Sequence, residues 1–280
     1  MGLWYEENYE DTLRLSIRSK RTIATTQSEF QTIEIFESAP FGRVLALDGV
    51  FMTSEYDEFF YHEMIVHPAL TAIESPRRVL IIGGGDGGTA REVLRHPAVE
   101  TVVMVEIDRL VVELCQTHLP AIGTAWDDPR LSVKIQDGIA FARACKTDSF
   151  DAVILDGSDP IGPAAPLFDE RFYQDIRRIL APHGIFSLQS ESPMITTDIW
   201  VSTQQRLRRC FEVVHPCFAP VPLYATGLWS WTLASSHVDG RKPRPDRIGP
   251  YLDDCKYYSP SIHQAAFQIP NYVHKLISNL

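Results

Sequence analysis

Apolar and polar residues alternate along the first part of the chain, a pattern typical of strands with one buried face. The alternation is clear over residues 13–17 and looser over residues 30–36. Pro40-Phe41-Gly42 and Asp48-Gly49 then separate two further apolar runs, and Asp-Gly between such runs favours a hairpin. We therefore predict a small antiparallel β-domain over residues 1–54.

The pattern changes after residue 55. Residues 59–72 have the periodicity of a helix, and short continuous apolar runs then alternate with helical stretches. These runs are the predicted strands of one sheet: Val79–Ile82, Thr101–Val105, Leu131–Ile135, Phe150–Leu155, Ile185–Leu188, Val213–Phe218 and Trp229–Ala234. Runs buried on both faces predict a mostly parallel sheet covered by helices. The expected fold class is α/β, with a Rossmann-like, methyltransferase-type domain over residues 55–280.

A glycine-rich turn follows the first of these strands and leads into a helical stretch. Gly83, Gly85 and Gly88 match the G-x-G-x-x-G pattern in the strand–turn–helix setting that it requires. Glu106 ends the next strand, where an acidic side chain can bind the hydroxyls of a ribose. Together these features favour a nucleoside site over a plain tight turn.

Asp86 lies inside the glycine turn and bears on the kind of nucleoside that fits. A dinucleotide would place its pyrophosphate against the N-terminus of the helix, where a carboxylate would repel it. A nucleoside with a positive charge would be attracted instead, and adenosyl sulfonium compounds meet that requirement. NAD is therefore the weaker interpretation.

A second acidic turn, Asp156-Gly157-Ser158-Asp159, follows the predicted strand of residues 150–155. Open α/β sheets bind ligands at the carboxyl ends of their strands, so Asp156 and Asp159 could share a pocket with Asp86. Turn formation alone, a calcium site and a glycosidase pair are the alternatives. The loop lacks the regular oxygen spacing of a calcium site, and a glycosidase would leave the glycine turn without a purpose. An ammonium substrate suits all three carboxylates.

Asp137-Gly138 is a further acidic position at the same predicted edge of the sheet. The carboxylate of Asp137 could accept a hydrogen bond from the amino group of adenine. It could equally cap the helix expected over residues 139–144, and both roles could hold together.

Composition and charge exclude several classes of function. The chain of 280 residues has a net charge of −10 and a pI near 5.4, which argues against a nucleic-acid partner. Its apolar runs are too short to span a membrane, and its N-terminus has no signal-peptide pattern. Five scattered cysteines indicate reduced thiols in a cytoplasmic protein.

Two further groups of residues are interpreted as structural. His62, Glu63 and His67 miss the His-Glu-x-x-His spacing by one position, so we expect no metal site. We expect the large apolar rings in the core or in a pocket wall: Trp4, Trp229 and Trp231.

Several longer segments of the chain resemble spermidine synthases. They are ALDGV at 46–50, DEFFYHEM at 57–64, IIGGGDGG at 81–88, DGSDPIGP at 156–163, KYYS at 256–259 and IHQAAF at 262–267. The resemblance extends from about residue 4 to the C-terminus, and several of these motifs are long and distinctive.

The resemblance implies the reaction and its residues. An aminopropyl group would pass from decarboxylated S-adenosylmethionine to a diamine, giving methylthioadenosine and, with putrescine as the default acceptor, spermidine. The donor would be a co-substrate and not a resident cofactor. Asp156 would be the proton acceptor, and Tyr61 would help to hold the attacking nitrogen. The residues implied for the donor are Gln31, Gly83, Gly85, Asp86, Glu106, Asp137, Gly138 and Pro163. Those implied for the amines are Tyr61, His62, Asp86, Asp156, Asp159, Gln189 and Tyr224. A homodimer or homotetramer, often joined through the N-terminal β-region, is implied as well.

Two other functions stay open. Methyl transfer from S-adenosylmethionine to a polyamine or diamino acid uses the same fold, although Asp86 would repel the carboxylate of that donor. A non-enzymatic polyamine-binding or scaffold protein is the third possibility, and the intact set of Asp86, Asp156 and Asp159 disfavours it.

The identity of the acceptor also stays open, because the chain departs from the family at a few positions. Gly157 stands where the family usually has a small Ser, Thr or Cys. The other departures are Tyr56, Met194, Leu223 and Ala225.

Overall fold

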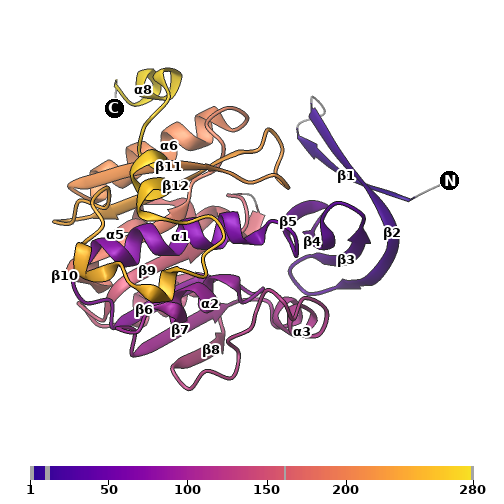
Figure 1. Ribbon diagram of the computed structural model, residues 1–280, viewed down its shortest axis with the longest axis horizontal. Coiled ribbons are helices and arrows are strands. Elements are labelled where there is room, and N and C mark those ends of the chain that lie inside the picture. Colours follow the sequence, from indigo (N-terminus) through magenta and orange to yellow (C-terminus); the bar gives the residue numbers. More distant parts are fainter. Residues whose placement is uncertain (1–2, 10–12, 161, 279–280) are drawn as a thin grey trace.

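The computed structural model describes residues 3–9, 13–160 and 162–278 (Figure 1). It places a small sheet from the N-terminal part of the chain beside a larger sheet that is flanked by helices (Figure 1). Within these residues, no helix is long and apolar enough to cross a membrane.

The N-terminal sheet has five strands in the order β1-β2-β3-β4-β5, and each neighbouring pair is antiparallel. The strands are β1 (Trp4–Tyr9), β2 (Leu13–Gln27), β3 (Thr32–Ser38), β4 (Gly42–Leu47) and β5 (Val50–Ser54). Asp48 and Gly49 have φ of 48° and 81° and join β4 to β5 as the predicted hairpin, with Leu47 opposite Val50. β5 ends at Ser54, and we propose that the boundary between the two domains lies directly after it.

The prediction for Trp4 was wrong, because this side chain is 54% exposed. Side chains alternate between the two faces of a strand, and in β1 the inward face belongs to Tyr5, Glu7 and Tyr9. Tyr5 stacks on Phe36 with ring centroids 3.9 Å apart, and Glu7 is buried. Trp4 therefore points to solvent.

The larger sheet has seven strands in the order β11-β12-β10-β9-β6-β7-β8. Its strands are β6 (Arg78–Gly83), β7 (Thr101–Glu106), β8 (Leu131–Ile135), β9 (Phe150–Asp156), β10 (Leu180–Gln189), β11 (Val213–Pro220) and β12 (Leu228–Ser235). β12 is antiparallel to both of its neighbours, whereas the pairs from β10 to β8 are parallel. The predicted mostly parallel Rossmann-like sheet is confirmed.

Helices cover both faces of this sheet. The α-helices are α1 (Glu58–Ala72), α2 (Gly88–Arg95), α3 (Arg109–His118), α4 (Gly138–Ala144), α5 (Glu170–Ile179), α6 (Thr197–Cys210), α7 (Pro260–Ala266) and α8 (Asn271–Ile277). Shorter 3-10 helices are η1 (Gly162–Phe168), η2 (Pro245–Arg247) and η3 (Pro250–Leu252). Successive residues of β6 show the two layers: Val79 and Ile81 pack on the side of α1 and α2, whereas Leu80 and Ile82 pack on the side of α5. The continuous apolar runs of the sequence follow from this two-sided burial.

The turn between β6 and α2 passes very close to the end of β9. Gly83 pairs with Asp156, and the N–H of Gly84 donates to the carbonyl oxygen of Asp156 at 2.9 Å. A Cβ on Gly83 would lie 2.0 Å from that carbonyl oxygen, and the φ of Gly83 is +83°. Only glycine fits both the contact and the backbone conformation.

We therefore expect Gly83→Ala to destabilise the protein by at least about 2 kcal/mol, because it adds a backbone clash to an unfavourable φ. Thermal unfolding should show a midpoint lower by roughly 4–8 °C.

Gly49→Ala is the matched control for this substitution. Gly49 has a similar φ of +81°, but a Cβ there would meet no atom within 4 Å. This variant measures the backbone penalty alone, and an equal loss of stability in both variants would contradict the role assigned to the close approach.

Candidate active site

A cavity of about 430 Å³ lies at the carboxyl ends of β6, β7 and β9, and the N-terminal sheet forms part of its wall. This is the volume of a site for a small organic ligand. The predicted site residues that line it are Gln31, Tyr61, His62, Gly85, Asp86, Glu106, Asp137, Gly138, Asp156, Asp159 and Tyr224. Gln189 lines a smaller adjoining pocket, and Gly83 packs under the wall against the backbone of β9. Pro163 lies in η1, and its side chain is outside the described part of the chain.

One end of the cavity is built around Glu106. Its Oε1 accepts from the N–H of Asp108 at 2.9 Å, and a Cβ on Gly85 would lie 3.1 Å from its Oε2. Asp108 in turn accepts from Ser28 and from the Nε2 of Gln31, at 2.6 and 3.0 Å. Asp108 therefore ties the loop of Gln31 to the end of β7, a contact that sequence reasoning missed.

The carboxyl group of Glu106 is buried beside other acids. Burial, with a smaller effect of the charges of Asp108 and Asp156, raises the pKa of Glu106 to about 7. With only the protein groups around it, this group is therefore partly protonated at neutral pH, and a hydrogen-bond donor beside it would favour the ionised form.

Asp137 caps α4. Its Oδ1 accepts from the N–H groups of Ile139 and Ala140 at 2.8 and 3.4 Å, so the predicted N-cap role is confirmed. Because both bonds end on Oδ1, the N-cap leaves Oδ2 for a ligand. Asp137 lines the same cavity as Glu106.

Asp156 is the last residue of β9 and lies under the glycine turn. Its Oδ2 accepts from the hydroxyl of Thr89 at 2.7 Å, and it forms a second hydrogen bond with Tyr61. Burial raises the pKa of Asp156, and the charge of Asp86 raises it further. His62 and the two hydroxyl donors oppose these effects without cancelling them. A carboxylate with a raised pKa beside a cavity is suited to accept a proton.

Asp86 is held from two sides. Its Oδ1 accepts from the N–H of Gly88 at 2.9 Å, and its Oδ2 lies 3.2 Å from the Nε2 of His62. Burial is the largest single effect and opposes ionisation. The charge and hydrogen bond of His62, the hydrogen bond from Gly88 and the charge of Arg91 together outweigh it and lower the pKa of Asp86. Asp86 is therefore a fixed negative charge next to Asp156.

The three residues of the near-match to His-Glu-x-x-His make contacts with different partners. His62 contacts Glu58 and Asp86. Glu63 accepts from the backbone N–H groups of residues 256–258 at 2.7–2.8 Å. His67 lies 3.0 Å from both Glu92 and His96, on a different part of α1.

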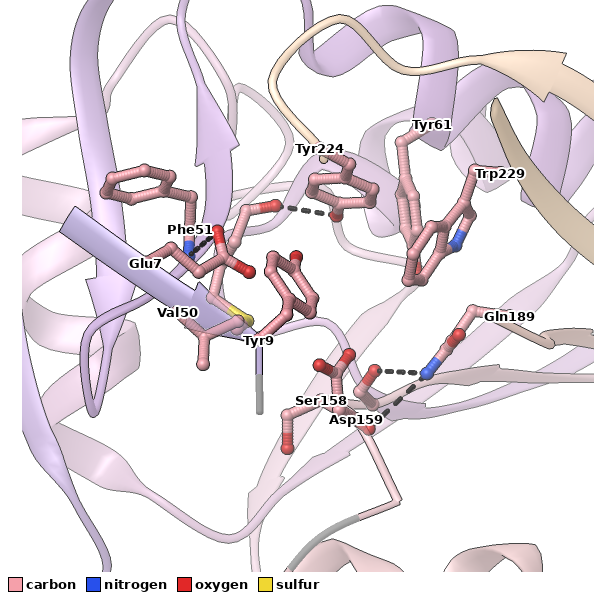
Figure 2. Close-up of a pocket in the computed structure, with 12 residues that line it drawn as sticks. Glu7, Tyr9, Val50, Phe51, Tyr61, Ser158, Asp159, Gln189, Tyr224 and Trp229 are labelled. Atoms are coloured by element: carbon pink, nitrogen blue, oxygen red, sulfur yellow. Dashed lines mark hydrogen bonds between the residues drawn. The ribbon is translucent and has the colours of Figure 1, made fainter. Parts of the chain in front are cut away.

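A smaller pocket continues from the cavity toward β1 (Figure 2). The predicted residues Tyr61, Asp159, Gln189 and Tyr224 line it together with Glu7, Tyr9 and Trp229 (Figure 2). The hydroxyl of Tyr224 donates to the carbonyl of Met52 at 2.8 Å, and its ring packs edge-on against Trp229 and Tyr61. Aromatic walls with acids at one end suit an aliphatic chain that ends in a cation.

Glu7 is an acid of this pocket that sequence reasoning missed. It is 2% exposed and accepts from the N–H of Phe51 at 3.2 Å (Figure 2). It also forms a hydrogen bond with Tyr9. Burial raises the pKa of Glu7 to about 7. The alternation of β1 would have placed Glu7 and Tyr9 on one face, but nothing in β1 itself indicates which pocket that face meets.

Glu191 is a second acid that was missed. It is 2% exposed, hydrogen-bonds Asp159 and has a φ of 68°, in the left-handed region that a non-glycine residue rarely adopts. Burial and the charge of Asp159 hold the pKa of Glu191 well above its usual value. Backbone strain of this kind tends to occur at functional sites.

Gly157 lies between Asp156 and Asp159, at a position with no steric demand for glycine. A Cβ there would meet only side-chain carbons of Leu155 and Leu167, at 3.6 and 3.7 Å. These are ordinary van der Waals distances, so a small side chain fits in this position.

Comparison with known proteins agrees with this geometry. The family model of the spermine/spermidine synthase domain matches residues 58–242, and that of the spermidine synthase tetramerisation domain matches residues 3–55. A polyamine aminopropyltransferase of Prochlorococcus marinus (strain MIT 9313) is 43% identical over 277 residues, covering 97% of this chain and 96% of its own. That of Bacillus subtilis (strain 168) is 38% identical and covers 98% and 99% of the two chains.

Solved structures of spermidine synthases share the fold over nearly the whole chain. One, a spermidine synthase in complex with the transition-state analogue AdoDATO, is 37% identical, with a TM-score of 0.96 over 99% of this chain and 96% of its own. The spermidine synthase of Thermotoga maritima is 37% identical, with a TM-score of 0.94 over 99% and 95% of the two chains. The chain thus belongs to the spermine/spermidine synthase family.

Proposed function

We propose that the chain is a polyamine aminopropyltransferase. It transfers the aminopropyl group of decarboxylated S-adenosylmethionine to a diamine, by default putrescine, and releases spermidine and methylthioadenosine. The observation that carries this proposal is the convergence of Asp86, Asp156 and Asp159 on one cavity that has Glu106 at its other end. The relatives named polyamine aminopropyltransferase support the same reaction.

The donor occupies the large cavity. The carboxylate of Glu106 accepts from the ribose hydroxyls, with Gln31 beside it, and Asp137 accepts from the adenine amino group. Asp86 then faces the ammonium at the end of the aminopropyl chain. Because S-adenosylmethionine carries a carboxylate next to this ammonium, the fixed charge of Asp86 favours the decarboxylated donor.

The acceptor lies across the boundary between the cavity and the smaller pocket. One nitrogen points to Asp156, and the ammonium at the other end meets Glu7 and Asp159, which is hydrogen-bonded to Glu191 behind it. Aliphatic carbons between the two ends pack against the rings of Tyr61 and Trp229. This arrangement recognises a cation at each end of a short apolar chain.

The chemical step is a displacement at the carbon next to the sulfonium. The attacking nitrogen gives one proton to Asp156 and forms the C–N bond as the C–S bond breaks, and the electron pair of that bond stays on sulfur in the neutral thioether. Thr89 and Tyr61 hold the carboxylate of Asp156 in place. Alignment of the two substrates supplies several kcal/mol of the rate acceleration.

We further propose that the protein assembles as a homodimer or homotetramer through the N-terminal sheet. Large apolar side chains are exposed on β1 and β2 or directly before them, with Leu3 at 56%, Trp4 at 54% and Leu13 at 40%. The match of residues 3–55 to a tetramerisation domain supports this surface as the contact.

The function is tested by incubating the purified protein with either donor and a panel of diamines of different length, with mass spectrometry of the products. We expect methylthioadenosine and an aminopropylated diamine from the decarboxylated donor. Adenosylhomocysteine with a methylated amine would favour the methyltransferase instead, and no product from either donor would reject both enzymes.

Asp156→Asn should lower kcat by about 10²- to 10⁴-fold, because the amide cannot accept the proton of the attacking amine. The affinity for methylthioadenosine should change little. Steady-state kinetics and calorimetry measure the two quantities.

Asp159→Asn is the matched comparison, since Asp159 holds charge without taking the proton. It should raise the KM of the diamine by roughly 10- to 100-fold with a small change in kcat. Near-normal turnover of Asp156→Asn, or equal kcat losses in both variants, would refute the assigned roles.

The affinity for methylthioadenosine should depend on pH through Glu106. The pKa of this group is about 7 in the empty site, so its ionised form, the stronger acceptor for ribose hydroxyls, is lost as the pH falls below 7. Calorimetry should give a dissociation constant roughly fivefold weaker at pH 6 than at pH 8, a difference of about 1 kcal/mol.

The Glu106→Gln variant should bind more weakly and show no such dependence. Asp137→Asn, which changes only the adenine end of the cavity, should keep the pH dependence of the affinity. An unchanged pH dependence in Glu106→Gln would assign the titration to another group. The nucleoside alone is used because Glu7, whose pKa is also about 7, lies in the pocket for the amine.

A further inference from the structure

We infer that Glu58 and Arg91 are positioning residues: they hold His62 as a doubly protonated imidazolium, which fixes Asp86 toward the aminopropyl amine. The inference rests on the proposed function and adds to it two charged residues that do not line the cavity. It also gives His62 a role different from direct contact with an acceptor.

Both ring nitrogens of His62 face carboxylates. Nδ1 lies 2.6 Å from Oε2 of Glu58, one turn earlier on α1, and Nε2 lies 3.2 Å from Oδ2 of Asp86. The side chain is 2% exposed. A neutral imidazole has one N–H and one lone pair, so it would present a lone pair to one of the two carboxylates. The doubly protonated ring satisfies both.

The ring is also fixed sterically. A Cβ on Gly88 would lie 2.4 Å from the ring, so the backbone of α2 passes directly along it. Tyr61 packs edge-on against the ring with centroids 5.4 Å apart. Gly88 is the last glycine of the predicted turn motif. The need to avoid the ring of His62 explains why this position is glycine better than contact with a ligand does.

Arg91 anchors the other end of the chain of charges. Its two terminal nitrogens donate to Oε1 and Oε2 of Glu58 at 3.0 and 2.8 Å, a fork that fixes the plane of the carboxylate. Arg91 is itself held by the carbonyl of Ile122 at 2.8 Å and by Glu92 at 2.6 Å. Positive and negative charges thus alternate from Arg91 through Glu58 and His62 to Asp86.

The groups that face His62 favour its charged form. Glu58 on α1, Asp86 in the glycine turn and Asp156 at the end of β9 are acids, whereas Arg91 on α2 is cationic and lies beyond Glu58. The phenol of Tyr61 packs against the ring as well. Burial lowers the pKa of His62, but the carboxylates of Asp86 and Glu58 outweigh it and hold the pKa well above its usual value.

The imidazolium has two consequences for the site. It keeps Asp86 ionised and oriented, because Oδ2 faces His62 while Oδ1 accepts from Gly88. It also limits the repulsion between Asp86 and Asp156, whose oxygens lie within 4.8 Å of each other and of His62. Without this charge, two adjacent carboxylates would compete to be protonated.

The test is Glu58→Gln, which keeps the shape of the side chain and an oxygen that can accept from Nδ1. The lost charge lowers the pKa of His62, so the ring becomes neutral as the pH rises and turns a lone pair toward Asp86. The ratio of variant to wild-type kcat/KM for the decarboxylated donor should therefore fall about tenfold between pH 6 and pH 8.5. A ratio that is low but constant over this range would show a merely structural role and overturn the inference.

Glu63→Gln is the matched control. Glu63 is an equally buried acid of the same helix, and it binds backbone N–H groups of residues 256–258 away from the cavity. This variant should lose stability and keep a constant kcat/KM ratio. A pH-dependent ratio in this control would contradict the assignment to Glu58.

Nitrogen NMR of the His62 ring gives a readout that does not need turnover or a folded variant. In the wild-type protein the ring should stay doubly protonated up to pH 8.5, and a neutral tautomer at pH 7.5 would overturn the inference. If the wild-type protein makes neither product, the proposed function fails while this measurement still decides the state of His62.

Discussion

The approach of the glycine turn to the end of β9 holds the two halves of the site together. Gly83 crosses the backbone of Asp156 at a distance that allows no side chain, and the N–H of Gly84 bonds to the same peptide group. Asp86 and Asp156 belong to different crossover units, separated by seventy residues of chain, yet this contact makes them neighbours. Every later feature of the site, from the paired carboxylates to the packing of α2 on His62, depends on that spacing.

The second organising feature is that each buried acid of the site is stabilised by a different partner. Asp86 is paired with His62, whereas Asp156 is held by hydroxyl donors and Asp159 by a hydrogen bond with Glu191. Each acid thus has a different partner, and the partners move the pKa values apart. The fixed acid can hold an ammonium while the acid with a raised pKa can accept a proton, which is how similar side chains take different roles in one cavity.

Much of the fold could be predicted from the sequence because its signals are local. The apolar runs of the sheet are continuous, the Asp48-Gly49 hairpin carries its own turn chemistry, and Asp137 precedes a helix that it caps. The residues that escaped prediction depend on long-range contacts. Glu7 matters only because β1 packs over the pocket, and Asp108 because it joins two domains. Trp4 was placed in the core on its residue type, but the alternation of an edge strand turns it outward.

The two ends of the substrate cavity differ in how closely the surrounding backbone is packed. The nucleoside end is built on the close-packed strands of the parallel sheet, where a single added methyl group would strain the backbone. The proposed amine end is bounded by β1, by the open position of Gly157 and by Asp159, which is hydrogen-bonded to the strained residue Glu191. Substitutions can therefore accumulate around the amine while the nucleoside pocket stays unchanged. Divergence within such a lineage would appear first in the length of amine accepted and only later, if at all, in the donor.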